Sequence, residues 1–190
     1  MKIKNIYITL QPFVSVLVET APLAALFVGT AFYSLHIGAA AAILASTILI
    51  FIQFAKDKSI LFFPLFSTFI SILFVSIAFI TGETFFIKIQ ASLFNGAFAF
   101  LLLLGWVRNY PVMKLFFGKQ FSLNHYTWMQ LSIRWAMFFL CLTIANEFAW
   151  RMLDDEGWVS VKVFIFAPAT ALFMASLVPL TIKGKIPRSN

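Results

Sequence analysis

The sequence has few charged residues and a single cysteine. Only 11% of its 190 residues are charged, whereas a soluble domain of this size carries roughly a quarter. Together with the hydrophobic share of 62%, this shortage excludes a soluble globular domain, a disordered chain and a collagen-like fibre. The lone Cys141 excludes a disulfide framework and a cysteine-based metal cage, and its apolar neighbours predict a buried, unreactive thiol.

Apolar residues are instead gathered in runs long enough to cross a bilayer. A spanning helix needs roughly 20 apolar residues, so we expect the whole chain, residues 1–190, to form one integral membrane domain. The runs lack strand alternation and are too long for the strands of a membrane barrel. The sequence therefore predicts an all-α, polytopic transmembrane helical bundle of about six spans. The predicted spans cover 13–34, 37–55, 60–81, 85–107, 128–150 and 158–182.

The first of these runs allows two interpretations. Lys2 and Lys4 precede it, as in a secretory signal, but the run continues past Glu19 and is too long for a cleaved segment. We expect it to be retained as the first spanning helix. A five-helix bundle without this span is the alternative.

The basic residues predict which side of the membrane each connection faces. With six spans, ten lysines and arginines fall on one side, against Arg151 alone on the other. The positive-inside rule assigns the richer side to the cytoplasm, so both termini are expected there. A net charge of +7 would favour nucleic acid in a soluble protein. Between apolar runs, it indicates topology and anionic membrane lipids instead, and no nucleic acid.

One connection, near residues 108–127, is long. After Pro111 it predicts a short amphipathic helix that lies at the cytoplasmic membrane surface and ends near Gly118. Lys114 and Lys119 would reach toward anionic headgroups; a docking surface for a partner is the alternative use. The expected apolar face comprises Val112, Met113, Phe116 and Phe117.

Ionisable residues inside the predicted spans are costly and therefore count as functional candidates. Glu19 and Arg134 lie toward the cytoplasmic ends, and Lys88, Glu147 and Lys162 lie about one turn from the outer ends. Both signs occur at each level, so pairing would offset part of the burial cost, and the two lysines are expected to extend to the headgroups. A proton or solute path is the alternative, although such a path needs charges near the midplane. The candidate polar network comprises Glu19, Lys88, Asn95, Arg134, Asn146, Glu147 and Lys162.

Small residues at four-residue spacing indicate close helix packing in two of the spans. We expect both rows to pack inside the protomer, with a homo-oligomer seam as the alternative. The rows are Gly38, Ala42 and Ser46, and Ala167, Ala171 and Ala175.

The sequence contains no recognisable catalytic motif. It has no His-Glu-x-x-His, Gly-x-Ser-x-Gly, P-loop or dinucleotide fingerprint. His36 and His125 fall on opposite sides of the membrane in the predicted topology, so they cannot share a metal. The acidic run 154–156 is typical of a solvated turn, because no pattern of oxygen ligands surrounds it. We therefore expect a protein that is not an enzyme and that has no cofactor and no metal.

Short motifs follow one another along most of the chain after Glu19. They are Glu19-x-x-Pro22-Leu23, Phe86-Ile87-Lys88, Pro111, Gly118-Lys119, Leu123, Trp128, Trp135-Ala136, Phe138-Phe139, Ala145-Asn146, Trp158-Val159 and Lys162-Val163-Phe164. In their order and spacing the chain resembles the YciB family, also called intracellular septation protein A. This resemblance implies a multi-pass protein of the bacterial inner membrane, needed for cell-envelope maintenance and septation. It also implies contacts with other inner-membrane division or elongation proteins, while a small transporter or channel remains the alternative.

Overall fold

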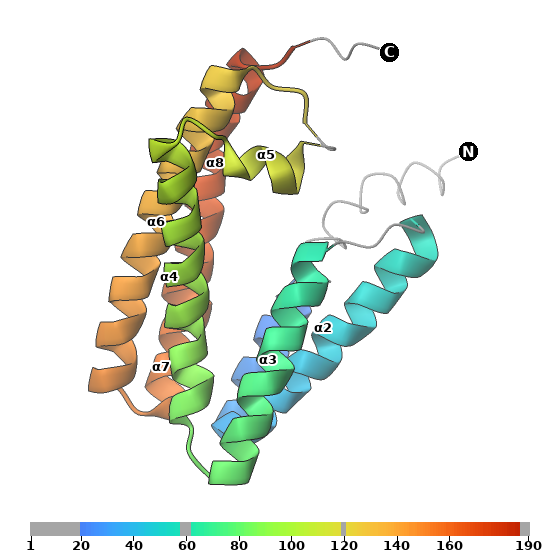
Figure 1. The fold of residues 1–190 in the computed structure, drawn as a ribbon. Coiled ribbons are helices and arrows are strands. Elements are labelled where there is room, and N and C mark those ends of the chain that lie inside the picture. Colours follow the sequence, from blue (N-terminus) through green and yellow to red (C-terminus); the bar gives the residue numbers. More distant parts are fainter. Residues whose placement is uncertain (1–19, 58–61, 119–120, 187–190) are drawn as a thin grey trace, which may run out of the picture. The chain divides into compact units, whose positions relative to one another are not determined.

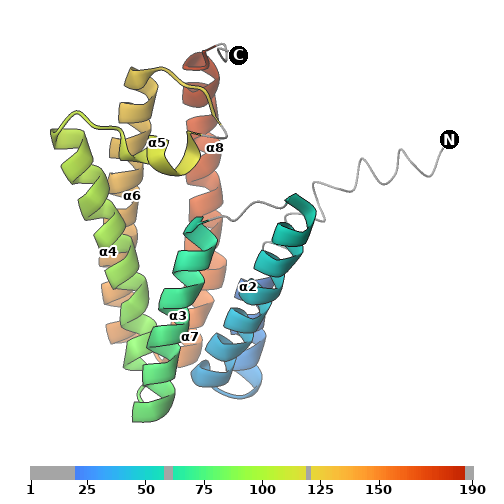
Figure 2. The same ribbon diagram turned by 45° about the vertical axis from the view of Figure 1, so that its right-hand side comes forward.

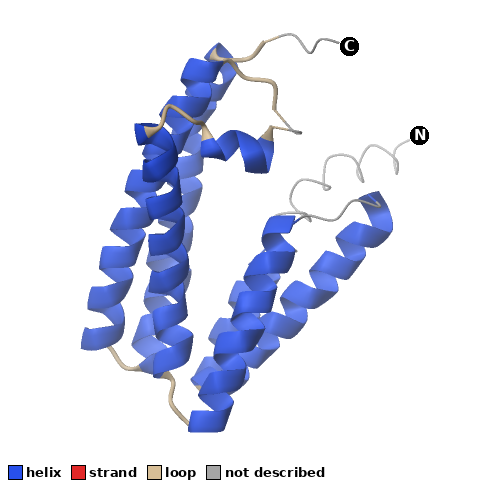
Figure 3. Ribbon diagram, viewed as in Figure 1, coloured by secondary structure: helices blue, strands red, loops and turns tan. Residues whose placement is uncertain are grey.

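The structure is a computed structural model and describes residues 20–57, 62–118 and 121–186. Every regular element within these ranges is a helix (Figures 1 and 3), and Leu123 and Lys185 form one isolated β-bridge. The elements are the helix Thr20–Phe32, α2 (Leu35–Asp57), α3 (Phe62–Thr81), α4 (Phe85–Val107), α5 (Val112–Phe117), α6 (His125–Met152), α7 (Asp155–Val161), the π-helical turn η1 (Lys162–Phe166) and α8 (Ala167–Lys183).

Five of the described helical segments are long and apolar enough to cross a membrane. α2, α3, α4 and α6 each form one, and α7, η1 and α8 together form the fifth, Asp155–Lys183. Their ends lie within about three residues of those predicted for the second to sixth spans. The prediction of an all-α polytopic bundle is confirmed.

The first predicted span is described only from Thr20 onward. Between Thr20 and Phe32 it is an apolar helix, shorter than a full crossing. The rest of this span, including Glu19, lies outside the described residues. The choice between six and five spans therefore stays a prediction.

The chain divides into two compact units. Unit 1 comprises Met1–Ile87 and Asp155–Val163, and unit 2 comprises Lys88–Asp154 and Phe164–Asn190. The last boundary falls inside η1, where the looser π turn precedes Pro168. Pro168 has no N–H to donate to the carbonyl of Phe164, so a regular α turn would lack a hydrogen bond there. The expectation of a single domain stays a prediction.

In unit 1 the helix Thr20–Phe32 and α2 form a tight helical hairpin. A Cβ added at Gly29 would lie only 2.6 Å from the Cα of Gly38, so the two backbones can approach this closely only with glycine. Gly38 therefore packs inside the protomer, as predicted for its row. α3 runs back along α2 (Figure 1), and the Nε2 atom of His36 lies 3.2 Å from the carbonyl oxygen of Ala78.

In unit 2, α4, α6 and α8 lie side by side, and α5 lies across them near one end (Figures 1 and 2). α5 contacts α6, and the Met113 backbone N–H donates to the Ser132 hydroxyl over 3.4 Å. Phe138 of α6 stacks on Phe173 of α8 with ring centroids 4.2 Å apart. The buried core of this unit comprises Leu102, Met113, Leu123, Trp128, Leu131, Ala136 and Leu177.

The end of α8 is tied to the segment that precedes α6. The Asn124 backbone N–H donates to the Gly184 carbonyl over 2.9 Å, and the Ile186 N–H donates to the Ser122 carbonyl over 2.9 Å. A Cβ at Gly184 would collide with the side chain of Thr127. This contact closes the end of unit 2 where α6 begins.

Two expectations about packing differ from the structure. Cys141 is exposed on α6, and Ala171 and Ala175 are exposed on α8, although the sequence predicted burial for all three. The reason is physical: lipid is as apolar as leucine, so an apolar side chain has no preference for the protein interior over the bilayer. α8 packs through Phe173 and Leu177 instead.

Candidate functional site

A group of polar side chains joins α4 to α6 within unit 2. The Asn146 side-chain amide is 1% exposed and donates two hydrogen bonds, to the Lys88 carbonyl oxygen over 3.1 Å and to the Ser92 hydroxyl over 2.8 Å. Glu147, the next residue of α6, also lies near Ser92. Ser92 therefore accepts from the Asn146 amide, and two hydrogen bonds hold α6 to α4 here.

Glu147 also forms an ion pair on its own helix. Its Oε2 atom lies 2.7 Å from the Arg151 Nη2 atom and 3.2 Å from Nε, one helical turn away. The Arg151 side chain is 62% exposed and that of Glu147 is 28% exposed. Glu147 thus pairs with an arginine that the sequence assigned to a loop, and its expected pairing with Lys88 or Lys162 stays a prediction.

Lys88 and Lys162, the two lysines predicted near the outer ends of their spans, have different surroundings. Lys88 is only 8% exposed, so it differs from the lysine expected to extend into the headgroups. Lys162 is half-buried, and its Nζ atom lies 4.4 Å from the ring centroid of Trp158, one turn earlier. A cation over an indole face is stabilised by the ring quadrupole, which offsets part of the cost of removing the ammonium group from water.

The remaining predicted residues do not join this group. Asn95 is half-buried on α4, and Arg134 is exposed on α6. Glu19 lies outside the described residues, so its predicted pairing with Arg134 stays a prediction. Within the described part of the chain, no group of three or more histidine, cysteine or acidic side chains could hold a metal ion.

Three residues that contact predicted ones were not selected from the sequence: Ser92 and Arg151 in unit 2, and Trp158 in unit 1. Each lies four residues from a residue that was selected, namely Lys88, Glu147 and Lys162. Residues four apart share one helix face, so this spacing was the available signal.

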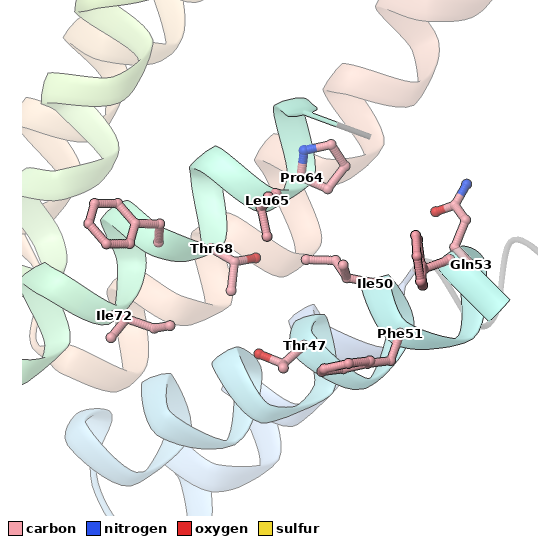
Figure 4. Close-up of a pocket in the computed structure, with 10 residues that line it drawn as sticks. Thr47, Ile50, Phe51, Gln53, Pro64, Leu65, Thr68 and Ile72 are labelled. Atoms are coloured by element: carbon pink, nitrogen blue, oxygen red, sulfur yellow. The ribbon is translucent and has the colours of Figure 1, made fainter. Parts of the chain in front are cut away.

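Unit 1 contains an apolar groove between α2 and α3 (Figure 4). Its volume is about 390 Å³, and Thr47 and Ile50 of α2 face Thr68 and Ile72 of α3 across it. The hydroxyl of Thr47 donates to the Ile43 carbonyl of its own helix over 2.8 Å. The groove therefore offers apolar surface and no reactive side chain.

Taken together, the membrane-length helices and the hydrogen bonds between them define a multi-pass helical membrane protein. Asn146 links α6 to α4, and Glu147 pairs with Arg151 one turn along α6. A comparison of sequences then places the chain more narrowly. The family described as "Intracellular septation protein A" matches residues 14–186.

Relatives of this family are similar to the chain over most of its length. Proteins named inner membrane-spanning protein YciB are 32% identical in Rickettsia akari, 32% in Rickettsia felis and 33% in Rickettsia rickettsii (strain Sheila Smith). Each match extends over 148 residues, which is 78% of this chain and 82% of the relative. No solved structure matches.

The chain belongs to the intracellular septation protein A family, whose members include the proteins named YciB. It is a multi-pass protein of the inner membrane, and the family name connects it with septation.

Proposed function

We propose that this protein supports septation and envelope maintenance by contacting other inner-membrane division or elongation proteins, and that it is not an enzyme. The match to the septation family over residues 14–186 carries this proposal. It is not a family of known enzymes, and the sequence contains no catalytic motif.

The arrangement of polar residues supports a structural role for them. Asn146, Ser92 and the Lys88 carbonyl use their hydrogen bonds to hold α4 against α6. Lys88 is the fourth residue of α4, and Asn146 lies six residues before the end of α6. At a rise of 1.5 Å per residue, these positions lie about 4 and 9 Å from the helix ends. A group this near the ends ties two helices together without lining the middle of the bilayer.

Depletion of the protein in its own cells, combined with proximity labelling, tests the proposal. We expect filaments or an altered cell width after depletion. A biotin ligase fused to the protein should label inner-membrane division or elongation proteins more strongly than the same ligase on an unrelated multi-pass protein. Normal morphology under envelope stress, with labelling no greater than that of the control, would overturn the proposal.

A small transporter or channel is the second candidate, favoured by the buried ionisable residue Lys88 in a spanning helix, whose backbone carbonyl accepts from the Asn146 amide. Flux of protons, ions or lipids in reconstituted vesicles would support it, provided that Glu147→Gln abolishes the flux. Vesicles with the wild-type protein that show no flux above protein-free vesicles would remove this candidate.

A further inference from the structure

A cleft with several polar residues in its lining lies at the end of unit 2 where α4 ends and α6 begins. Its volume is about 570 Å³, and its lining includes Asn109, Tyr110, Lys114 and His125. These residues come from the turn after α4, from α5 and from the first turn of α6. α4 and α6 are both long enough to span a membrane. The end of α4 and the start of α6, beside the cleft, therefore lie at the level of the lipid headgroups.

The turn that forms one wall has a defined backbone. The Tyr110 N–H donates to the Gly105 carbonyl over 2.8 Å, and the Asn109 N–H donates to the Trp106 carbonyl over 3.0 Å. This pair of bonds is a Schellman motif, which ends a helix with a left-handed residue. Asn109 adopts that conformation with φ of 54°. Asparagine adopts this conformation more readily than most residues do, but at a higher energy than glycine. An asparagine at this position therefore indicates that its side chain has a role of its own.

A hydrogen bond across the cleft holds that side chain. The Nε2 atom of His125 lies 3.2 Å from the Oδ1 atom of Asn109, and since Oδ1 can only accept, the imidazole donates. The amide NH₂ of Asn109 keeps both of its donors, which have no partner among the described residues. Tyr110 and the exposed Lys114 also line the cleft, and their side chains carry a hydroxyl and an ammonium donor.

The charge around the cleft has one sign. Residues 105–118, 121–127 and 180–186, which form this end of unit 2, contain no aspartate or glutamate. They contain Arg108, Lys114, Lys183 and Lys185, which are all exposed. A phosphate would be attracted to this end, whereas the ammonium group of a zwitterionic headgroup would find no carboxylate to pair with.

From these observations we infer that the cleft lined by Asn109, Tyr110, Lys114 and His125 binds the phosphate of an anionic phospholipid headgroup. Lys114 supplies the charge, Asn109 and Tyr110 supply directed N–H and O–H donors, and His125 orients Asn109. The lipid tails would remain in the bilayer beside α4 and α6. α5 thus serves as one wall of a lipid site as well as an anchor at the membrane surface.

Native mass spectrometry of the full chain, titrated with phosphatidylglycerol in detergent, tests this site. Lys114→Gln should weaken the tightest phosphatidylglycerol binding by about fivefold, as expected for one lysine near a lipid surface. Asn109→Gly should also weaken it, by about threefold or more. Glycine accepts the left-handed backbone, so this variant removes the amide without disturbing the turn. Circular dichroism of both variants should match the wild type.

Lys183→Gln is the matched control, because it removes the same charge from an exposed residue at the same end of unit 2 but outside the cleft lining. It should change binding by less than about twofold. Three outcomes would overturn the inference: equal effects of Lys114→Gln and Lys183→Gln, phosphatidylcholine binding as tight as phosphatidylglycerol binding, or displacement of the lipid by glycerol 3-phosphate. The first would indicate diffuse attraction, the second no preference for anionic lipid, and the third a site for water-soluble phosphate esters.

Discussion

At the scale of single residues, several buried polar side chains of the described helices hydrogen-bond with an adjacent helix or with another turn of their own helix. Asn146 is the clearest case, since both hydrogen bonds of its amide cross from α6 to α4. In a bilayer there is no water to replace a lost partner, yet the unfolded segment within the membrane also finds partners. A hydrogen bond of this kind is therefore stabilising by a modest amount.

Asn146→Ala should lower the free energy of unfolding by about 1 kcal/mol, because it removes two interhelical hydrogen bonds of roughly 0.6 kcal/mol each. Unfolding with a denaturing detergent, followed by circular dichroism, measures the change. Asn95→Ala is the matched control, since Asn95 is only half-buried and makes no hydrogen bond with a residue that the structure describes. Equal destabilisation by the two substitutions would contradict the role assigned to Asn146.

Gly38→Ala should destabilise the protein by about 1–3 kcal/mol, the range for overpacking a tight contact. The added methyl would collide with the carbonyl of Leu26 and the side chain of Thr30 on the facing helix. Gly96→Ala is the control, because its new Cβ would lie 3.6 Å from the nearest methyl of Thr143, an ordinary contact. Thermal unfolding in detergent should show a lower midpoint for Gly38→Ala and an unchanged midpoint for Gly96→Ala.

At the scale of elements, the ends of α5 were predicted from the sequence, but its packing against the other helices of unit 2 was not. The sequence indicated a short amphipathic helix between Pro111 and Gly118, and α5 covers Val112–Phe117. Its buried residue Met113 belongs to the core of unit 2, so α5 rests on the helices and not only on lipid. Phe116, expected on the same apolar face, is 39% exposed.

Cysteine labelling should separate the two faces of α5. In a Cys141→Ser background, Leu115→Cys should react with a membrane-impermeant maleimide at least about tenfold faster than Met113→Cys, because a buried thiol reacts only when the helix opens locally. Leu115 is 65% exposed and Met113 is 7% exposed. Labelling in inverted vesicles, where the cytoplasmic face is outside, gives the rates. Similar rates at the two positions would mean that α5 does not dock.

At the scale of the whole molecule, charge distribution predicts the orientation in the membrane. The ten basic residues of one side include Lys183, Lys185 and Arg188 near the end of the chain. Because lysine and arginine resist transfer across the membrane, the C-terminus is expected in the cytoplasm. The N-terminus should lie there only if the first run spans.

Reporter fusions test both statements. Alkaline phosphatase fused after Asn190 should be inactive, because the enzyme needs the oxidising periplasm to form its disulfides, whereas a fluorescent protein at the same place should fluoresce. The same pair fused before Met1 decides the number of spans. A fluorescent N-terminal fusion supports six spans, and an active N-terminal phosphatase supports five. An active phosphatase after Asn190 would contradict the predicted orientation.

Local composition was enough to predict the class of protein and the limits of its spanning helices. Lipid requires about 20 apolar residues per crossing and satisfied backbone hydrogen bonds, so span positions follow from local composition. The motif order also led to the correct family. The pairing of Glu147 with Arg151 could have been predicted from their four-residue spacing on one helix, although Arg151 was not selected.

Which helix faces pack together, and which polar groups form contacts, became visible only in the three-dimensional arrangement of the helices. Helix faces in lipid carry no hydrophobic contrast, so the exposure of Ala171 and Cys141 could not be inferred from apolar character. Asn146 meets Ser92 across 54 residues of chain, and His125 meets Asn109 across a turn whose left-handed backbone has no marker beyond one asparagine. Such contacts depend on how each helix is rotated and shifted relative to its neighbours. Rotation and shift are set by the packing of many side chains at once.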